Sequence, residues 1–137
     1  MPAKTPKRGT GQFQWNAGGW FGSQIGGTLW MLIVGVTTFG RLPAFALMAI
    51  VLASLVNGLG IWLWSRRDRL APYLGIQVLV GIVALATLTL LTVFDNTGHL
   101  AELDTRFRNN PRGLYIILLM FPVLMGLFHF QNRSTKK

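Results

Sequence analysis

The composition of this 137-residue chain excludes an ordinary soluble domain and several kinds of active site. With 51% hydrophobic and only 12% charged residues, the chain has too few charged side chains to cover a water-facing surface. The lack of cysteine excludes disulfides, thiolate metal sites and cysteine nucleophiles, and the net charge of +9 would indicate nucleic-acid binding only in a soluble chain.

Four long stretches of the chain carry no Asp, Glu, Lys or Arg. An α-helix rises about 1.5 Å per residue and the hydrocarbon core of a bilayer is about 30 Å thick, so roughly 20 apolar residues complete one crossing. Each stretch is long enough for a crossing. The sequence therefore predicts an all-α integral membrane four-helix bundle, formed by residues 13–132, with spans at about 17–40, 44–65, 72–94 and 113–131.

The positions of lysine and arginine predict which side of the membrane each end occupies. Short cytoplasmic loops carry an excess of these residues. Placing both termini in the cytoplasm puts nine of the 13 basic residues inside and three of the four acidic residues outside. We therefore expect a multi-pass protein of the plasma membrane, the bacterial inner membrane, with both termini cytoplasmic. The inner basic residues are Lys4, Lys7, Arg8, Arg66, Arg67, Arg69, Arg133, Lys136 and Lys137.

The two ends of the chain are predicted to be basic cytoplasmic tails. Residues 1–12 are rich in Lys, Pro, Thr and Gly without apolar periodicity, which predicts disorder, and residues 133–137 form the second tail. The first helix follows, with Asn16 as its N-terminal cap. Trp15 and Trp20 are expected to anchor it at the membrane interface, where amphipathic indole rings are favoured.

The second helix is predicted to pair with the first and to end at the cytoplasmic face. Only residues 41–43 separate the two helices, so they must form an antiparallel hairpin. Trp62 and Trp64 at its end are further interface anchors. Arginines follow them directly, and cations at this depth favour contact with anionic lipid of the cytoplasmic leaflet.

Prolines mark features of the third and fourth helices. Pro72 suits the first turn of the third helix, where its missing N–H has no helical partner in any case. Pro122 lies inside the fourth helix, removes a backbone hydrogen bond near Leu118, and predicts a kink there.

The outer connection, residues 95–112, is predicted to contain a short amphipathic helix on the membrane surface. Its apolar residues recur at helical spacing, and the pairs Glu102 with Arg106 and Asp104 with Arg108 have the favourable i, i+4 orientation. A divalent-metal site built from Asp95, His99, Glu102 and Asp104 is the alternative, but the arginine partners favour a salt-paired surface. The apolar residues are Leu100, Leu103 and Phe107.

Three glycines of the first span are spaced four residues apart and are expected to form a helix-packing seam. Gly18, Gly22 and Gly26 fall on one face, where the absence of side chains lets another helix approach closely. The other helix belongs either to the same chain or to a second protein, which includes a second copy. A third alternative is a glycine-rich entry segment at the membrane interface, and all three remain open from the sequence.

One polar residue of each predicted span falls in the cytoplasmic half of the membrane. Gln24, Asn57, Gln77 and His129 lie at similar depth, so the sequence predicts one intramembrane polar layer. Two interpretations remain: a clasp that fixes helix register, or the lining of a permeation path. Asp, Glu, Lys and Arg are missing from the spans, which argues against proton-coupled transport.

No arrangement of residues indicates catalysis, so we expect no enzyme, no cofactor and no resident metal. The function hypotheses are a small homo-oligomeric channel or passive transport component, and a non-catalytic accessory or assembly subunit of a larger membrane complex. The expected partners are the bilayer, with anionic lipid at its cytoplasmic face, and the chain itself or another membrane protein at the glycine seam. Nucleic acid is not expected as a partner.

Overall fold

The computed structural model describes residues 14–103 and 110–134, and within them it is entirely helical, without strands. The predicted all-α class is therefore confirmed for this part of the chain. The predicted tail at residues 1–12 lies outside the described residues. The elements are α1 (Ala17–Thr38), α2 (Pro43–Ser65), α3 (Pro72–Asn96), the 3₁₀ helices η1 (Leu100–Glu102) and η3 (Pro111–Leu119), and α4 (Met120–Ser134).

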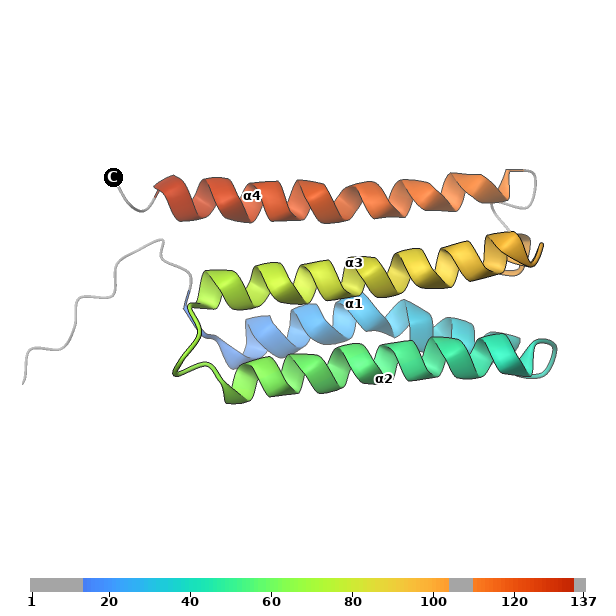
Figure 1. The fold of residues 1–137 in the computed structure, drawn as a ribbon, viewed down its shortest axis with the longest axis horizontal. Helices are drawn as coiled ribbons and strands as arrows, with labels where there is room; N and C mark the ends of the chain where they lie inside the picture. The colour runs from blue at the N-terminus through green and yellow to red at the C-terminus, as the bar shows by residue number, and fades with distance from the viewer. Residues whose placement is uncertain (1–13, 104–109, 135–137) are drawn as a thin grey trace, which may run out of the picture.

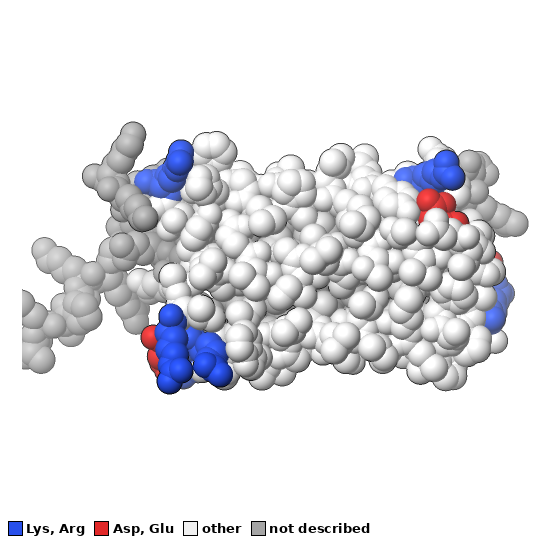
Figure 2. Space-filling model, in the orientation of Figure 1, with Lys and Arg blue, Asp and Glu red and all other residues white. Residues whose placement is uncertain are grey.

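Three helical segments are long and apolar enough to cross a bilayer: α2, α3 and the continuous segment Pro111–Arg133, which joins η3 to α4. They identify a membrane protein. The helix α1 is not among them, because glycines, Ser23, Gln24 and threonines dilute its apolar residues. In Figure 2 the Lys, Arg, Asp and Glu side chains gather near the two ends of the molecule, and an uncharged band separates them.

The helix boundaries follow from local chemistry. The Oδ1 of Asn16 accepts a hydrogen bond from the Gly19 N–H at 3.1 Å, so Asn16 caps α1 as predicted. Pro43 and Pro72 occupy the first positions of α2 and α3, where a missing N–H leaves no helical bond unmade. In Figure 1 the start of α1 and the end of α4 lie at the same end of the molecule.

The fourth segment differs from the predicted helix at 113–131. Its outer part, η3, is a 3₁₀ helix of nine residues, and α-helical geometry begins only at Met120, two residues before Pro122. Pro122 has no N–H for the Leu118 carbonyl, so the α-helical ladder is interrupted where it would continue outward. A 3₁₀ helix rises about 2.0 Å per residue, so η3 adds roughly 18 Å to a 15-residue α4 that is too short to cross alone. The segment also reaches Ser134, inside the predicted tail.

The helix predicted in the outer connection can be followed only in part, because residues 104–109 lie outside the described residues. The helix α3 continues to Asn96, and η1 has only three residues before the described chain is interrupted. Glu102 forms an ion pair of 3.7 Å with Arg41, which lies in the turn between α1 and α2. The partner predicted for Glu102, Arg106, and the whole pair of Asp104 and Arg108 lie outside the described residues, as does Phe107.

The packing of the helices is uneven. The helix α1 packs mainly against α2, α2 also contacts α3, and α4 with η3 packs against α3. Figure 1 shows α4 at the edge of the group, with α3 between it and α2. The core consists of small residues of α2, such as Ala49 and Ala53, packed with larger residues such as Met31 and Phe94. Because α1 and α4 barely touch, a groove remains between them.

Candidate functional site

The predicted polar residues of α1 and α2 form a closed cluster. The Gln24 Nε2 donates to the backbone carbonyl of Asn57 at 2.7 Å and to its Oδ1 at 3.0 Å. The Asn57 Nδ2 donates in turn to the Thr28 Oγ1 at 2.9 Å and to the Ala53 carbonyl at 2.8 Å. Gln24 and Thr28 are almost completely buried. These hydrogen bonds fix the register of α1 on α2, because sliding either helix breaks them.

The other two polar residues link α3 to α4 instead. The Gln77 Nε2 donates to the Met125 carbonyl at 3.0 Å. The Tyr73 hydroxyl and the His129 Nδ1 share a hydrogen bond of 2.9 Å. Tyr73 was not among the predicted site residues, although its position four residues before Gln77 places it on the same face of the helix.

The four predicted residues do not share one set of hydrogen bonds. Gln24 and Asn57 bond to each other between α1 and α2, whereas Gln77 and His129 each bond to another residue across the contact between α3 and α4. In both places the bonds join helices that already pack against each other. Two buried acceptors, the Oε1 atoms of Gln24 and Gln77, have no hydrogen-bond partner among the described residues. The Gln24 amide lies directly over Gly60, where a methyl group would collide with it.

Of the glycine seam, Gly18 and Gly22 face away from the other helices of the chain, whereas Gly26 lines the groove between α1 and α4. A Cβ built on Gly22 or Gly26 would meet nothing within 4 Å, and one on Gly18 would meet only the nearby Asn16 side chain at 3.4 Å. Packing of these glycines against another helix of the same chain is therefore not what the structure shows. Association with a second protein through this face stays a prediction.

Different glycines allow the close helix contacts within the chain. A Cβ on Gly35 would lie 2.5 Å from Ile50 Cγ1 and 3.1 Å from the Ala46 carbonyl oxygen, so α1 and α2 approach closely there. A Cβ on Gly75 would lie 2.6 Å from Trp15 Cη2. Gly35 and Gly75 do not belong to the regular spacing of the seam, so no sequence pattern distinguishes them from other glycines.

The tryptophans predicted as interface anchors have two different environments. Trp15, Trp20 and Trp64 pack together, with ring centroids 4.9 to 6.3 Å apart. Trp20 is 5% exposed and its Nε1–H donates to the Gly60 carbonyl at 3.1 Å, so it is a core residue of this end rather than an anchor. Trp62 is half exposed, with the Arg66 guanidinium 5.4 Å from its ring, as suits an interface.

The outer acidic residues contact neighbouring side chains. Asp95 accepts a hydrogen bond from the Tyr115 hydroxyl at 3.1 Å and lies 3.7 Å from Arg112, which fastens η3 to the end of α3. His99 packs edge-on against Phe45. Among the described residues no three His, Asp or Glu side chains gather to hold a metal ion; Asp104 lies outside them.

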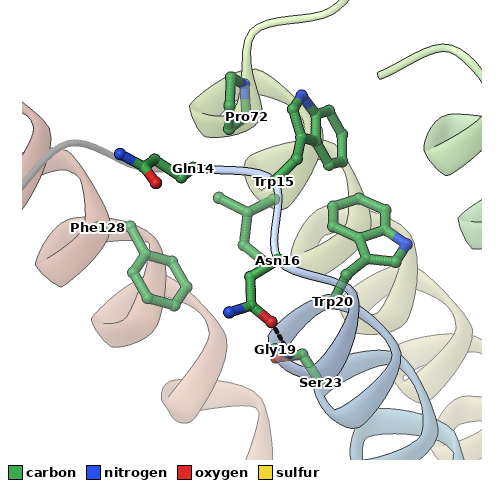
Figure 3. Close-up of a pocket in the computed structure, with 9 residues that line it drawn as sticks. Gln14, Trp15, Asn16, Gly19, Trp20, Ser23, Pro72 and Phe128 are labelled. Atoms are coloured by element: carbon green, nitrogen blue, oxygen red, sulfur yellow. Dashed lines mark hydrogen bonds between the residues drawn. The ribbon is translucent and has the colours of Figure 1, made fainter. Parts of the chain in front are cut away.

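A cavity at the end of the molecule that carries Arg66, Arg67, Arg69 and Arg133 was not predicted. It has a volume of ≈ 210 Å³ and lies between α1, the start of α3 and α4. Figure 3 shows the side chain of Gln14 pointing toward α4, which carries Phe128, and that of Asn16 turned toward Gly19, with the rings of Trp15 and Trp20 on the other side. No pattern within one helix could have revealed this cavity, because three helices form it.

No family model, curated protein or solved structure matches this chain. The assignment of function therefore depends on the geometry of the polar pairs, the glycine face and the groove.

Proposed function

We propose that the chain crosses the bacterial inner membrane four times, as a four-helix bundle with both termini in the cytoplasm. The support is that α1 carries no charged residue, runs along α2, and begins at the same end of the molecule where α4 finishes (Figure 1). Among the described residues, that end carries Arg66, Arg67, Arg69 and Arg133, as the positive-inside rule requires of a cytoplasmic face.

Single cysteines labelled with a membrane-impermeant reagent test this topology. Cysteine at Thr97 should react from outside the cell, while cysteine at Ser65 should react only after the membrane is opened. The reverse pattern would invert the orientation. Reaction of both from outside would show that α3, which lies between the two positions, does not cross the membrane.

Within that topology, the function best supported is that of a non-catalytic accessory or assembly subunit of a larger membrane complex. The observation that carries this proposal is the pairing of the intramembrane polar side chains. Gln24 is 2% exposed and its amide group donates hydrogen bonds to Asn57 of the same chain. Its side chain therefore does not face the central axis of an oligomer. Amide donors that bond within one chain stabilise the fold of that chain, whereas a channel lining must face water.

The partner would contact the outer face of α1. Gly18 and Gly22 lie there beside Ile25 and Leu29, which are 56% and 49% exposed. A face of glycines and exposed aliphatic residues lets a second transmembrane helix approach closely, and van der Waals contact is the main force for association in lipid. We therefore propose a hydrophobic transmembrane helix of another protein as the partner on this face.

Purification in mild detergent followed by native mass measurement tests the proposal. The wild type should retain a different membrane protein, and Gly22→Leu should lose it while Gly58→Leu retains it. Gly58 is a matched control because it is an exposed glycine on α2 and its Cβ would also meet nothing within 4 Å.

The competing channel hypothesis has its own measurement. A homo-oligomer without a second protein, together with ion flux in reconstituted vesicles, would replace the accessory proposal. If Gly22→Leu and Gly58→Leu retained the partner equally, the outer face of α1 would not be the contact surface.

A further inference from the structure

The groove between α1 and α4 has the dimensions of a lipid-binding site. Its floor is α3, through Leu79 and Val83, and its walls are Gly26 and Trp30 of α1 and Phe121 of the fourth segment. Most of its surface is apolar, and it opens sideways toward the space that lipid would occupy. Gly26 is the member of the glycine seam that lines it, whereas Gly18 and Gly22 do not.

The groove continues into the smaller cavity at the arginine-rich end. Ser23, Ile76 and Phe128 line both, so the two form one path. Both are mostly apolar, and at the entrance of the path, its arginine-rich end, the lining includes the amides of Gln14 and Asn16, visible in Figure 3. Amides at one end of an otherwise apolar path match a phospholipid, which has a polar headgroup and apolar chains.

The length of the groove suits the acyl chain of one leaflet. On the fourth segment the groove extends from Ile117 to Phe128, about 18 Å at the rises of η3 and α4. The hydrocarbon core of a bilayer is about 30 Å thick, so a helix that crosses it would extend well beyond the groove, whereas an acyl chain spans about half of that thickness.

The charges around the entrance select the kind of headgroup. Among the described residues, this end carries four arginines and one aspartate, Asp68. At the opposite end Arg41 and Arg112 are each paired with an acidic residue, Glu102 and Asp95. The entrance is therefore at the end with excess positive charge, which attracts an anionic headgroup.

We propose that the groove between α1 and α4 binds an anionic phospholipid, with an acyl chain between Gly26 and Phe121 and the headgroup at the entrance formed by Gln14 and Asn16. The bound lipid closes the side of the molecule where α1 and α4 do not touch. This proposal does not depend on the accessory function, since Gly18 and Gly22, which carry that proposal, do not line the groove.

Native mass spectrometry of the full chain in mild detergent tests the proposal. Phosphatidylglycerol should remain bound as one lipid per chain and should bind on the order of tenfold more tightly than phosphatidylcholine with the same acyl chains. Gly26→Leu should weaken phosphatidylglycerol binding by a similar factor, because the leucine side chain fills the groove. Its Cβ meets nothing within 4 Å, so the helix itself accommodates the change.

Gly22→Leu is the matched control and should bind the lipid as the wild type does, because Gly22 does not line the groove. It also separates this proposal from the accessory function, since it should remove the protein partner while leaving the lipid bound. Equal binding of the two lipids, or equal binding by wild type and Gly26→Leu, would overturn the proposal.

A fluorescence measurement locates the acyl chain. Phosphatidylglycerol with brominated chains should quench the emission of Trp30, which lines the groove, and Trp30→Phe should lose most of that quenching increment. An unchanged increment in Trp30→Phe would place the lipid elsewhere. A second copy of the chain or a helix of another protein cross-linked at Gly26 would likewise exclude the lipid from the groove.

Discussion

Replacement of Gly60 by alanine should loosen the contact between α1 and α2. The added Cβ would lie 2.5 Å from the Oε1 and 2.8 Å from the Nε2 of Gln24, which is far inside normal contact distance. Because Gln24 is buried, its amide must move away from Asn57, and both hydrogen bonds that it donates are lost. The change therefore tests whether this polar cluster holds the two helices in register.

The size of the effect follows from the bonds lost and from the intrinsic gain of alanine over glycine. Interhelical hydrogen bonds in membranes average about 0.6 kcal/mol and reach about 1.7, so losing two destabilises by roughly 1 to 3 kcal/mol. Alanine in a helix is favoured over glycine by about 0.5 to 1 kcal/mol. Gly58→Ala has the same intrinsic gain without a collision, because nothing lies within 4 Å of its Cβ.

Both variants replace a glycine of α2 by alanine, so the intrinsic gain in helix stability is the same in both. It cancels when their free energies of unfolding are compared. Unfolding in mixed micelles of sodium dodecyl sulfate and a mild detergent, followed by circular dichroism, should place Gly60→Ala about 1 to 3 kcal/mol below Gly58→Ala in free energy of unfolding. Equal stability of the two variants would refute the argument, because it would mean that Gln24 relaxes without losing structure.

Two further substitutions test the same end of the molecule. Gly75→Ala should displace the indole of Trp15 from α3 and lower the thermal midpoint relative to Gly81→Ala, whose Cβ meets nothing within 4 Å; equal midpoints would mean that Trp15 does not pack there in solution. Asn57→Leu removes the side-chain bonds to Gln24 and Thr28 and should destabilise the fold by about 1 to 2 kcal/mol in the same micelle assay. Vesicles containing the wild type should show no ion flux for this variant to alter, and measured flux that changes with Asn57→Leu would restore the channel hypothesis.

Much of the secondary structure could be predicted from the sequence. Charge is excluded from the hydrocarbon core, so the uncharged runs marked the helices, and observed ends such as Pro43, Pro72 and Ser65 lie within a residue of the predictions. Capping and proline effects act over a few residues, which is why Asn16 was also identified correctly.

The helix type of the fourth segment depended on longer-range contacts. The sequence marked Pro122 as a disruption, but the disruption takes the form of the 3₁₀ helix η3, tied to α3 through Tyr115 and Asp95. A local pattern predicts that a helical ladder is interrupted, whereas neighbouring helices decide which geometry replaces it.

The sequence by itself determined how far along its helix each polar and small residue lies, because that distance follows from the residue's position at a known helical rise. Only the tertiary structure decided which residues face one another, since that depends on how each helix is rotated about its axis. Thus Gln24 lies against Gly60 and Asn57, and Gln77 reaches α4. The regularly spaced glycines remain on the outside, and the groove exists because α1 and α4 do not meet.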